Sequence, residues 1–421
     1  MQWLNRATLR LLTENTLDRE EKIMAEQFTT LASLTVDGKG SYGIGASAVP
    51  FSKDLYTYLR ITDIKDDGTL NLKGLKSVDD EKASEYILKP NDIVFARTGA
   101  STGRNYFYDG MDGEFVYAGF LIKFSIDEKK VNPKYIKYFC QSKQYKDWIN
   151  SFNTGSTRGN INAQTLGKMP IPLIERTTQD ALVNILSSID EKIKKNNEIN
   201  NNLEQQMQAL FNEYLSSNKF SDLTTVENVV LSANTGADAI KKAPIVDYDT
   251  GIRCIRVGDM TNNRSFQDWG FTKVTDDVFK RYQLHKNDIV ITRTASLGLN
   301  TIIPEELPAV YNNGLIRLTV NTSNVLPLYL FRQFQMKDFS NYIARIESET
   351  SVRPNMKINY LLKYEFVLPP ITKQNEIIAL LTPMLNQQNK LIVENKHLKA
   401  LRDTLLPKLM SGELDVSNIE I

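Results

Sequence analysis

The sequence predicts an α/β (α+β) protein with two duplicated mixed α/β domains, separated by two long helices that form an antiparallel coiled coil. The first observation is an apolar stripe with heptad spacing from Gln179 to Leu215. The second is the return of this stripe from Gln374 to Leu409, 195 residues later, and the third is a set of matching sequence blocks at nearly the same offset. A helix with one narrow apolar stripe must bury it against a partner, and the other copy is the obvious partner.

The two stripes alternate spacings of four and three residues. In the first copy the stripe consists of Leu182, Leu186, Ile189, Ile193, Asn196, Asn200, Leu203, Met207, Leu210 and Tyr214. In the second copy it consists of Ile377, Leu381, Met384, Gln388, Leu391, Asn395, Leu398, Arg402, Leu405 and Leu409. Polar residues fill the positions between them, as expected for the exposed faces of a coiled coil. Each helix would be about 50 Å long at 1.5 Å per residue, which suits a rigid spacer.

Three asparagines interrupt the stripes near their middle, namely Asn196, Asn200 and Asn395. Buried asparagine fixes the register of a coiled coil at some cost in stability, so we expect these residues to set the register. If the helices are antiparallel and centred on one another, Asn196 falls near Asn395. The alternative is local looseness of the seam. Pro383 lies inside the second stripe and should kink or restart that helix.

Composition is that of an ordinary soluble globular protein. The chain has 421 residues, of which 41% are apolar and 24% are charged, and its longest apolar runs are too short to span a membrane. The first 26 residues are too charged for a secretory signal, which favours a cytoplasmic location. Cys140 and Cys254 give no metal pair or disulfide framework and are predicted to be buried. A net charge of +1 requires that any basic groups for nucleic acid be gathered locally.

These observations divide the chain into five segments. Residues 1–27 are predicted to be a helix that joins the helical scaffold, with a plain surface helix as the alternative. Residues 28–174 form the first α/β domain and 175–216 the first spacer helix. Residues 217–370 form the second α/β domain, and 371–421 the second spacer helix with a C-terminal tail.

Short β-branched runs inside each domain predict the strands of a mixed sheet. The clearest runs are Ile93–Phe95, Phe120–Phe124, Ile289–Ile291 and Leu315–Val320. Helices are expected between them, for example over Pro133–Phe152 and Pro327–Ile346. Between the matched blocks the two copies differ almost completely, as expected when a shared frame holds loops that do different jobs.

One repeated loop is a candidate for contacting DNA. Residues 97–104 follow a predicted strand and carry Arg97, Thr98, Ser101, Thr102 and Arg104, and the counterpart over 293–298 carries Arg293, Thr294 and Ser296. An arginine and hydroxyl groups in a glycine-rich loop suit phosphate oxygens or base edges. The alternative is a structural turn whose arginine pairs with a carboxylate of its own frame, such as Asp63 or Asp92.

A second basic loop recurs at the same offset. It carries Arg158 and Asn160 in the first copy, and Arg353 and Asn355 in the second. Arginine and asparagine hydrogen-bond guanine and adenine edges in pairs, so these four residues are also candidate DNA-binding residues. Trp148 is expected to pack in the core or at its rim.

No catalytic or metal site is predicted. The repeated pairs Asp63 and Asp92, and Asp259 and Asp288, could hold a metal for nuclease chemistry, but we favour carboxylates that cap backbone groups in turns, because no recurring Lys or His completes a hydrolytic site. The Asn132-Pro133 pair is explained as a helix start. The Gly43-Ile44-Gly45 segment is not completed to a dinucleotide-binding motif.

The whole arrangement resembles the specificity subunit of a type I restriction-modification enzyme. The resemblance is carried by the Asn-Asp-Ile-Val…Arg-Thr blocks at 91 and 287, the Pro-Ile-Pro-Leu-Ile and Val-Leu-Pro-Pro-Ile segments at 170 and 367, and the ending Leu405–Leu414. No single block is specific, but together they cover the chain.

That resemblance implies a protein without an active site or cofactor of its own. Each domain would be a target-recognition domain for one half of a bipartite DNA sequence, and the coiled coil would set the gap. Two methyltransferase subunits carrying S-adenosylmethionine would dock on the helices and methylate adenine. Up to two restriction subunits, using ATP and Mg, would join them. The alternatives are a non-catalytic coiled-coil adaptor with two peptide-binding domains, and a metal-dependent nuclease using Asp63 and Asp92.

Overall fold

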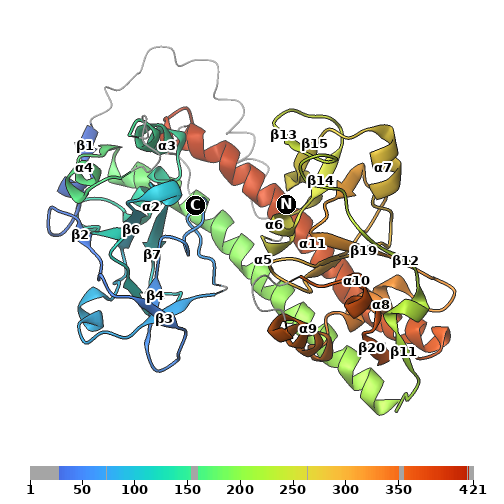
Figure 1. Ribbon diagram of the computed structural model, residues 1–421. Helices are drawn as coiled ribbons and strands as arrows, with labels where there is room; N and C mark the ends of the chain where they lie inside the picture. The colour runs from blue at the N-terminus through green and yellow to red at the C-terminus, as the bar shows by residue number, and fades with distance from the viewer. Residues whose placement is uncertain are drawn as a thin grey trace. The chain divides into compact units, whose positions relative to one another are not determined.

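The computed structural model describes residues 28–72, 74–152, 160–262, 264–349, 355–414 and 416, which form two compact units (Figure 1). Unit 1 comprises the described residues up to Lys195 and those from Glu394 onward, and unit 2 comprises Asn196–Val393. The predicted helix over residues 1–27 lies outside the described residues. Both units contain the same three sheets in the same strand order, which confirms the duplicated mixed α/β class.

Unit 1 is built on two four-stranded sheets and one two-stranded sheet. The first has the order β2 (Ser41–Tyr42), β9 (Leu121–Ser125), β6 (Asp92–Ala96), β7 (Asn105–Tyr108), with every neighbour antiparallel. The second has the order β3 (Ala48–Pro50), β5 (Lys76–Val78), β4 (Tyr56–Leu59), β8 (Phe115–Tyr117), in which β4 and β8 are parallel. The third pairs β1 (Phe28–Thr30) with β10 (Pro170–Pro172).

Unit 2 repeats this plan strand for strand. Its first sheet has the order β12 (Val230–Thr235), β19 (Leu315–Val320), β16 (Ile289–Thr292), β17 (Asn300–Ile302). Its second sheet has the order β13 (Ile245–Val246), β15 (Gly270–Thr272), β14 (Arg253–Ile255), β18 (Ala309–Tyr311). The third sheet pairs β11 (Leu223–Thr225) with β20 (Glu365–Val367). The parallel pair recurs as β14 with β18. The predicted strands are therefore present, with one correction: β9 starts at Leu121, and Phe120 lies in the preceding turn.

The helical segments predicted after β9 and β19 are each divided in two. Unit 1 has α2 (Pro133–Phe139), α3 (Lys143–Asn150) and α4 (Ala163–Gly167). Unit 2 has α6 (Val257–Thr261), α7 (Asp276–Tyr282), α8 (Pro327–Gln333), α9 (Lys337–Glu349) and α10 (Ile358–Leu362). In unit 1 the break is fixed by Ser142, whose hydroxyl accepts a hydrogen bond from the Tyr145 backbone nitrogen and so caps a new helix.

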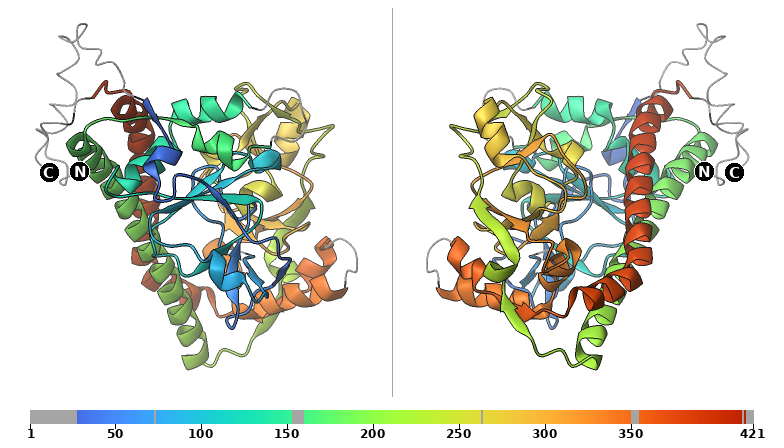
Figure 2. Two further views of the ribbon diagram at one scale, coloured as in Figure 1. Left: turned by 90° about the vertical axis from the view of Figure 1, so that its left-hand side faces the viewer. Right: turned by 90° about the vertical axis from the view of Figure 1, so that its right-hand side faces the viewer.

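Two long helices, α5 (Arg176–Ser217) and α11 (Ile371–Met410), contribute to both units. Within unit 1, Leu182 and Leu186 of α5 share a core with Leu406 and Leu409 of α11, so the helices run in opposite directions (Figure 2). Within unit 2, Tyr214 of α5 hydrogen-bonds Glu376 of α11, again with opposite sense. These contacts confirm the antiparallel coiled coil.

The burial pattern follows the predicted stripes with one exception. Leu210 is 39% exposed, whereas its neighbour Phe211 is fully buried. The Phe211 ring lies 5.3 Å from the Tyr329 ring of α8, so at this end α5 turns its apolar face toward the α/β domain of unit 2. Pro383 does not restart the helix, because α11 continues through it, and the alternative of a kink at Pro383 stays a prediction.

Buried hydrogen bonds fasten each long helix to its domain in the same way. In unit 1, Gln179 is 2% exposed and its side-chain oxygen accepts from the Asn132 backbone nitrogen. In unit 2, Gln374 is fully buried and accepts from the Leu326 backbone nitrogen. Each long helix thus starts from a fixed position on its own domain. No helix in the described part of the chain is long and apolar enough to cross a membrane.

Candidate nucleic-acid interface

The loop after β6 is a tight hairpin that presents the first predicted arginine. The Ala96 nitrogen donates to the Arg104 oxygen at 2.8 Å, and the Gly103 nitrogen donates to the Ala96 oxygen at 2.9 Å. Gly103 has φ +86°, and a Cβ there would lie 2.5 Å from a methyl carbon of Ile149 on α3. Only glycine fits this combination of left-handed backbone and close approach.

The loop after β16 has the same construction in unit 2. The Thr292 nitrogen donates to the Leu299 oxygen at 2.8 Å, which closes the hairpin. Gly298 has φ +77°, and a Cβ there would lie 2.8 Å from the Ile343 side chain of α9. The two loops are therefore positioned by equivalent contacts with the second helix of each pair.

In each unit the two predicted DNA-binding loops lie side by side. Thr98 forms an isolated β-bridge with Asn160, and Thr294 forms one with Asn355. The Ile161 nitrogen donates to the Arg97 oxygen at 3.0 Å. The sequence offered these segments as separate candidates, and the structure joins them. Arg158 and Arg353 lie outside the described residues.

The two equivalent arginines have different surroundings. Arg293 is held by its own frame: its guanidinium donates to the carbonyl oxygens of Met356 and Asn313, both at 3.2 Å, and to the Asn355 side-chain oxygen at 2.9 Å. Arg97 instead lies over the Tyr42 ring, 5.0 Å from its centroid. In the described part of the chain its Nε is buried without a hydrogen-bond partner. Among the described residues, the Arg97 Nε thus lacks the carbonyl partner that the Arg293 Nε has in Met356.

The alternative in which Arg97 pairs with Asp63 or Asp92 is wrong. Asp63 is bound by the Arg60 guanidinium at 2.7 Å. Asp92 accepts from the Ser125 hydroxyl at 2.5 Å and lies 3.4 Å from the Lys123 ammonium. Both carboxylates are therefore neutralised by other residues of unit 1.

The remaining polar residues of the first loop are partly used within it. Arg104 donates to Asp66 at 2.6 Å, and its Nη1 lies 3.5 Å from the Ser101 hydroxyl. The Thr102 hydroxyl donates to the Gly99 oxygen at 2.8 Å. In unit 2 the carbonyl of Ser296 accepts a hydrogen bond from the Thr292 hydroxyl. DNA-binding roles for these side chains remain predictions.

All four repeated aspartates cap a backbone nitrogen three residues earlier, which confirms the capping interpretation. Asp63, Asp92, Asp259 and Asp288 accept from Arg60, Lys89, Arg256 and His285 respectively, at 2.8–2.9 Å. Burial raises the pKa of Asp288 despite this hydrogen bond and the nearby Arg317. Among the described residues, no three His, Cys, Asp or Glu side chains are grouped to hold a metal ion.

Other sequence interpretations concern packing. Asn132 caps α2 by accepting from the Lys134 nitrogen, as predicted. Gly43 lets the segments after β2 and β8 approach closely, because a Cβ there would lie 2.3 Å from the Ala118 oxygen. Both cysteines are buried, and Trp148 packs against the core of unit 1.

The seam asparagines differ in exposure. Asn196 is fully buried, Asn395 is 7% exposed, and Asn200 is half-buried. Within unit 2 the Gln388 amide donates to the Asn200 backbone oxygen at 3.1 Å. Their role in setting the register remains a prediction.

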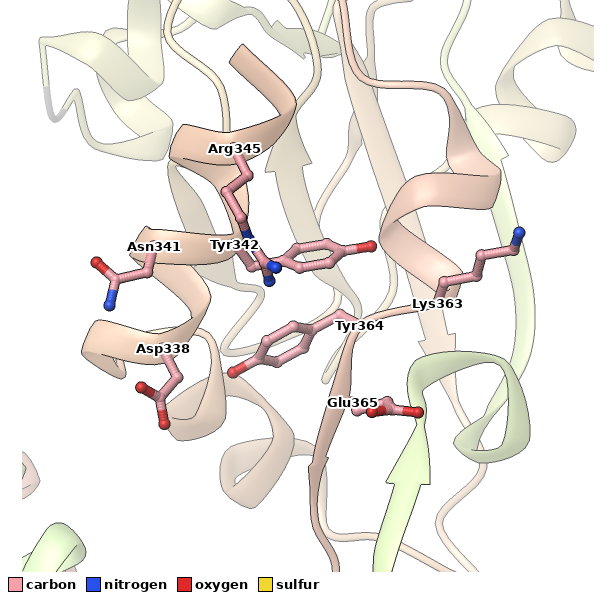
Figure 3. A pocket seen from close by; sticks show the side chains of 7 residues that line it. All are labelled: Asp338, Asn341, Tyr342, Arg345, Lys363, Tyr364 and Glu365. Atoms are coloured by element: carbon pink, nitrogen blue, oxygen red, sulfur yellow. The ribbon is translucent and has the colours of Figure 1, made fainter. Parts of the chain in front are cut away.

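Unit 2 also has an open pocket of about 420 Å³ between α9 and the turn that leads into β20 (Figure 3). Asp338, Asn341, Tyr342, Arg345, Lys363, Tyr364 and Glu365 line it. The rings of Tyr342 and Tyr364 lie 5.3 Å apart, and the Arg345 guanidinium lies 5.5 Å from the Tyr342 centroid. Charges of both signs surround the pocket, which gives it no clear preference for an anion or a cation.

Two side chains next to Arg97 were missed by the sequence analysis. Tyr42 on β2 is 42% exposed, and Phe120 before β9 is 58% exposed. Phe120 was assigned to a strand because it begins the largely apolar run Phe120–Phe124, which only Lys123 interrupts. The available signal was Gly119, which favours a turn at this point.

A duplicated α/β domain with paired loops, each fastened to a long helix, defines a two-domain recognition protein. The type I restriction modification DNA specificity domain matches residues 52–205 and 231–399, so the chain belongs to this family. Both copies of the repeat are included in the match.

Curated relatives agree with this assignment. The specificity subunit of the MjaIX type I restriction enzyme from Methanocaldococcus jannaschii is 22% identical over 70% of this chain and 72% of its own. The HindI specificity subunit from Haemophilus influenzae is 21% identical over 78% of this chain and 87% of its own. A crystal structure of an S subunit from M. genitalium has a TM-score of 0.50 at 16% identity, covering 93% of this chain and 97% of that one, and shows a shared fold.

Proposed function

We propose that each unit recognises one half of a bipartite DNA sequence, for a type I restriction-modification complex. The observation that carries this proposal is the repeated pairing of an Arg–Thr loop with an Asn segment, Thr98 with Asn160 and Thr294 with Asn355, in a chain of the DNA specificity family. Backbone contacts fix these loops, while the side chains on them differ between the units. Two frames with different side chains suit two different half-sites.

The chain contributes recognition and assembly rather than catalysis. Two methyltransferase subunits dock on the coiled coil, and each brings S-adenosylmethionine for adenine methylation. Up to two restriction subunits bring ATP and Mg. The duplication supports binding of two equivalent partners, because each unit offers the same arrangement of a domain fastened to a long helix through Gln179 or Gln374.

The long helices set the unread gap between the half-sites. They contain 42 and 40 residues, so each is about 60 Å long at 1.5 Å per residue. The two half-sites are therefore separated by a fixed number of base pairs, and a motif with a variable gap would contradict this role.

The test is to express the chain with its methyltransferase partner in a host that lacks adenine methylation and to map modified adenines by single-molecule sequencing. We expect one two-part motif with a fixed gap. Absence of modification, with both proteins soluble and associated, would overturn the proposal and favour the coiled-coil adaptor. DNA retention by the purified complex should also fall steeply with salt, as phosphate contacts require.

Single substitutions then assign half-sites to units. Arg97→Ala should abolish or relax modification at one half of the motif while leaving the complex assembled. Loss of assembly instead would assign Arg97 a structural role.

A further inference from the structure

We propose that Phe120, Arg97 and Tyr42 of unit 1 form an aromatic–cation patch that contacts a base of the half-site recognised by this unit. The proposal rests on the DNA-recognition function above and names the side chains that carry it in unit 1. Unit 2 has Gly314 and Thr235 at the corresponding positions, so the two half-sites are contacted with different chemistry.

Phe120 is a large apolar side chain exposed beside the DNA-binding loop. Phe120 is 58% exposed, although β8 before it and Leu121–Phe124 of β9 after it are largely buried. The Arg97 nitrogen donates to the Phe120 oxygen at 3.1 Å, which fixes the two residues next to each other at the backbone. Most of the Phe120 side chain therefore faces solvent and is accessible to a ligand that approaches this loop.

Tyr42 positions the cation of this patch. Its ring lies under the Arg97 guanidinium at 5.0 Å, and its hydroxyl oxygen accepts from the Ala163 nitrogen of α4 at 3.1 Å. The ring is therefore anchored at its polar end and offers its face to the arginine. A guanidinium held over an aromatic ring keeps its charge and its remaining donors available to a ligand.

In the equivalent loop of unit 2, the arginine side chain is hydrogen-bonded to its own domain. There the Arg293 nitrogen donates to the Gly314 oxygen at 2.9 Å, the same backbone contact, but the Arg293 side chain is engaged by Asn355, Met356 and Asn313. A Cβ at Gly314 would lie 2.7 Å from a methyl carbon of Val257. Unit 2 therefore has no room for a side chain where unit 1 exposes Phe120.

The chemistry of the patch points to DNA bases. Apolar rings contact thymine methyl groups or insert against partly unstacked base steps, and arginine binds guanine edges or the adjacent phosphate. A peptide ligand would need a groove, but the described residues here form an exposed hairpin end and turn. Asp63 and Asp92, the carboxylates considered as partners of Arg97, are each paired with another cation of unit 1.

The experiment compares methylation motifs of complexes that contain wild-type chain, Phe120→Ala, Tyr42→Ala, Tyr42→Phe or Phe51→Ala. Phe51 is a matched control because it is also an exposed phenylalanine of unit 1, at 53%. We expect Phe120→Ala and Tyr42→Ala to slow methylation roughly tenfold, a typical effect of losing one aromatic–base contact, and to relax base preference in one half of the motif only. Tyr42→Phe keeps the ring, so its methylation rate and motif should change little. Phe51→Ala should have the methylation rate and motif of the wild type.

The outcomes separate the two proposals. If the wild-type complex produces no two-part motif, the proposed function fails. If it does, but Phe120→Ala and Tyr42→Ala keep the rate and the full motif, the patch plays no part in recognition. A loss of preference in both halves together, or a lowered melting temperature of the complex, would also overturn the proposal, since it would indicate a structural role.

Discussion

Gln179 accepts a hydrogen bond from the backbone nitrogen of Asn132 at 2.8 Å, and this bond ties the start of α5 to the start of α2 across 47 residues of sequence. The Gln179 amide nitrogen donates to the Ile174 oxygen, also at 2.8 Å, so both ends of the side chain are used. Gln374 makes the equivalent pair of contacts with Leu326 and Pro369 in unit 2. Because the donor and acceptor groups of each buried glutamine amide are hydrogen-bonded, the amide fixes the position of the long helix on its domain.

Replacing Gln374 by alanine should destabilise unit 2 by about 2 kcal/mol, because the Leu326 nitrogen and the Pro369 oxygen would lose their buried partner. Chemical denaturation measures the change. Gln387→Ala is the matched control, since Gln387 lies on the exposed face of the same helix. Equal effects of the two substitutions would show that the buried contact does not stabilise the junction.

The second prediction concerns the stability contributed by the ion pair between Arg332 and Glu204. Arg332 is 2% exposed in α8, and its Nη1 lies 2.5 Å from a carboxylate oxygen of Glu204 on α5. Glu204→Gln leaves the Arg332 guanidinium buried without its counter-charge and should lower the free energy of unfolding by about 2 kcal/mol. This loss is smaller than for a fully buried pair, because water reaches Glu204.

Adding Arg332→Met to Glu204→Gln should restore most of this stability, because the methionine would pack beside Met207 without a charge to bury. Glu198→Gln, on the exposed face of α5, is the control and should change the free energy of unfolding by less than about 0.5 kcal/mol. A double variant less stable than Glu204→Gln alone would refute this explanation.

Local periodicity made the helical part of the fold predictable. Leu182 and Leu381 are fully buried, as predicted. Both belong to apolar stripes whose spacing follows one face of a helix, and this spacing is visible in the sequence. Phe211 was missed because it is buried by Tyr329, more than a hundred residues away, and such a contact leaves no local pattern. The same reason explains why Leu210 was wrongly assigned to the stripe.

The candidate site was predictable as a set of loops but not as a set of contacts. Arg97 and Arg293 occupy matching sequence blocks, and both do follow equivalent strands. The surroundings of the two side chains differ because Tyr42 lies under Arg97 and Asn355 beside Arg293, and both partners come from segments that are distant in the sequence. Sequence similarity between the two copies therefore predicted where each loop lies in its domain. The contacts of each side chain could not be predicted, because they depend on residues that are close only in the folded structure.

The cluster around Asp190 predicts a pH dependence of unit 1. Its carboxylate accepts from Lys137 and Tyr138, each at 3.0 Å, and from Arg402 at 3.2 Å. Burial opposes ionisation, but the two cations and the hydroxyl outweigh it and hold the pKa of Asp190 below its usual value. A lowered folded-state pKa stabilises the fold above the unfolded value near 3.9, and this contribution is lost as pH falls through the folded value.

Asp190→Asn should therefore lower the stability of unit 1 by about 2 kcal/mol at neutral pH, and the difference from wild type should shrink below about pH 4. Thermal unfolding from pH 7 to pH 3 measures it. Asp147→Asn removes the exposed partner of Lys143 in the same unit and should have little effect at any pH. A difference that persists unchanged at pH 3 would mean that the charge of Asp190 is not what stabilises the cluster.

The contrast between the two arginines gives the last prediction. Arg293→Lys keeps the charge but cannot reproduce three hydrogen bonds to Met356, Asn313 and Asn355, so it should destabilise unit 2 by about 2 kcal/mol. Arg97→Lys gives up only a ring contact and should change stability by less than about 1 kcal/mol, while weakening methylation at one half-site.

Unfolding curves and methylation maps of these two variants separate structural from recognition roles, because each arginine is the control for the other. We expect Arg293→Lys to be the less stable variant and Arg97→Lys to be the one with an altered motif at normal stability. The reverse result would mean that hydrogen bonding within the unliganded loop does not indicate which arginine contacts DNA. In that case the Arg293 side chain would have to leave its three partners on binding, and the affinity for DNA would be reduced by the free energy of those contacts.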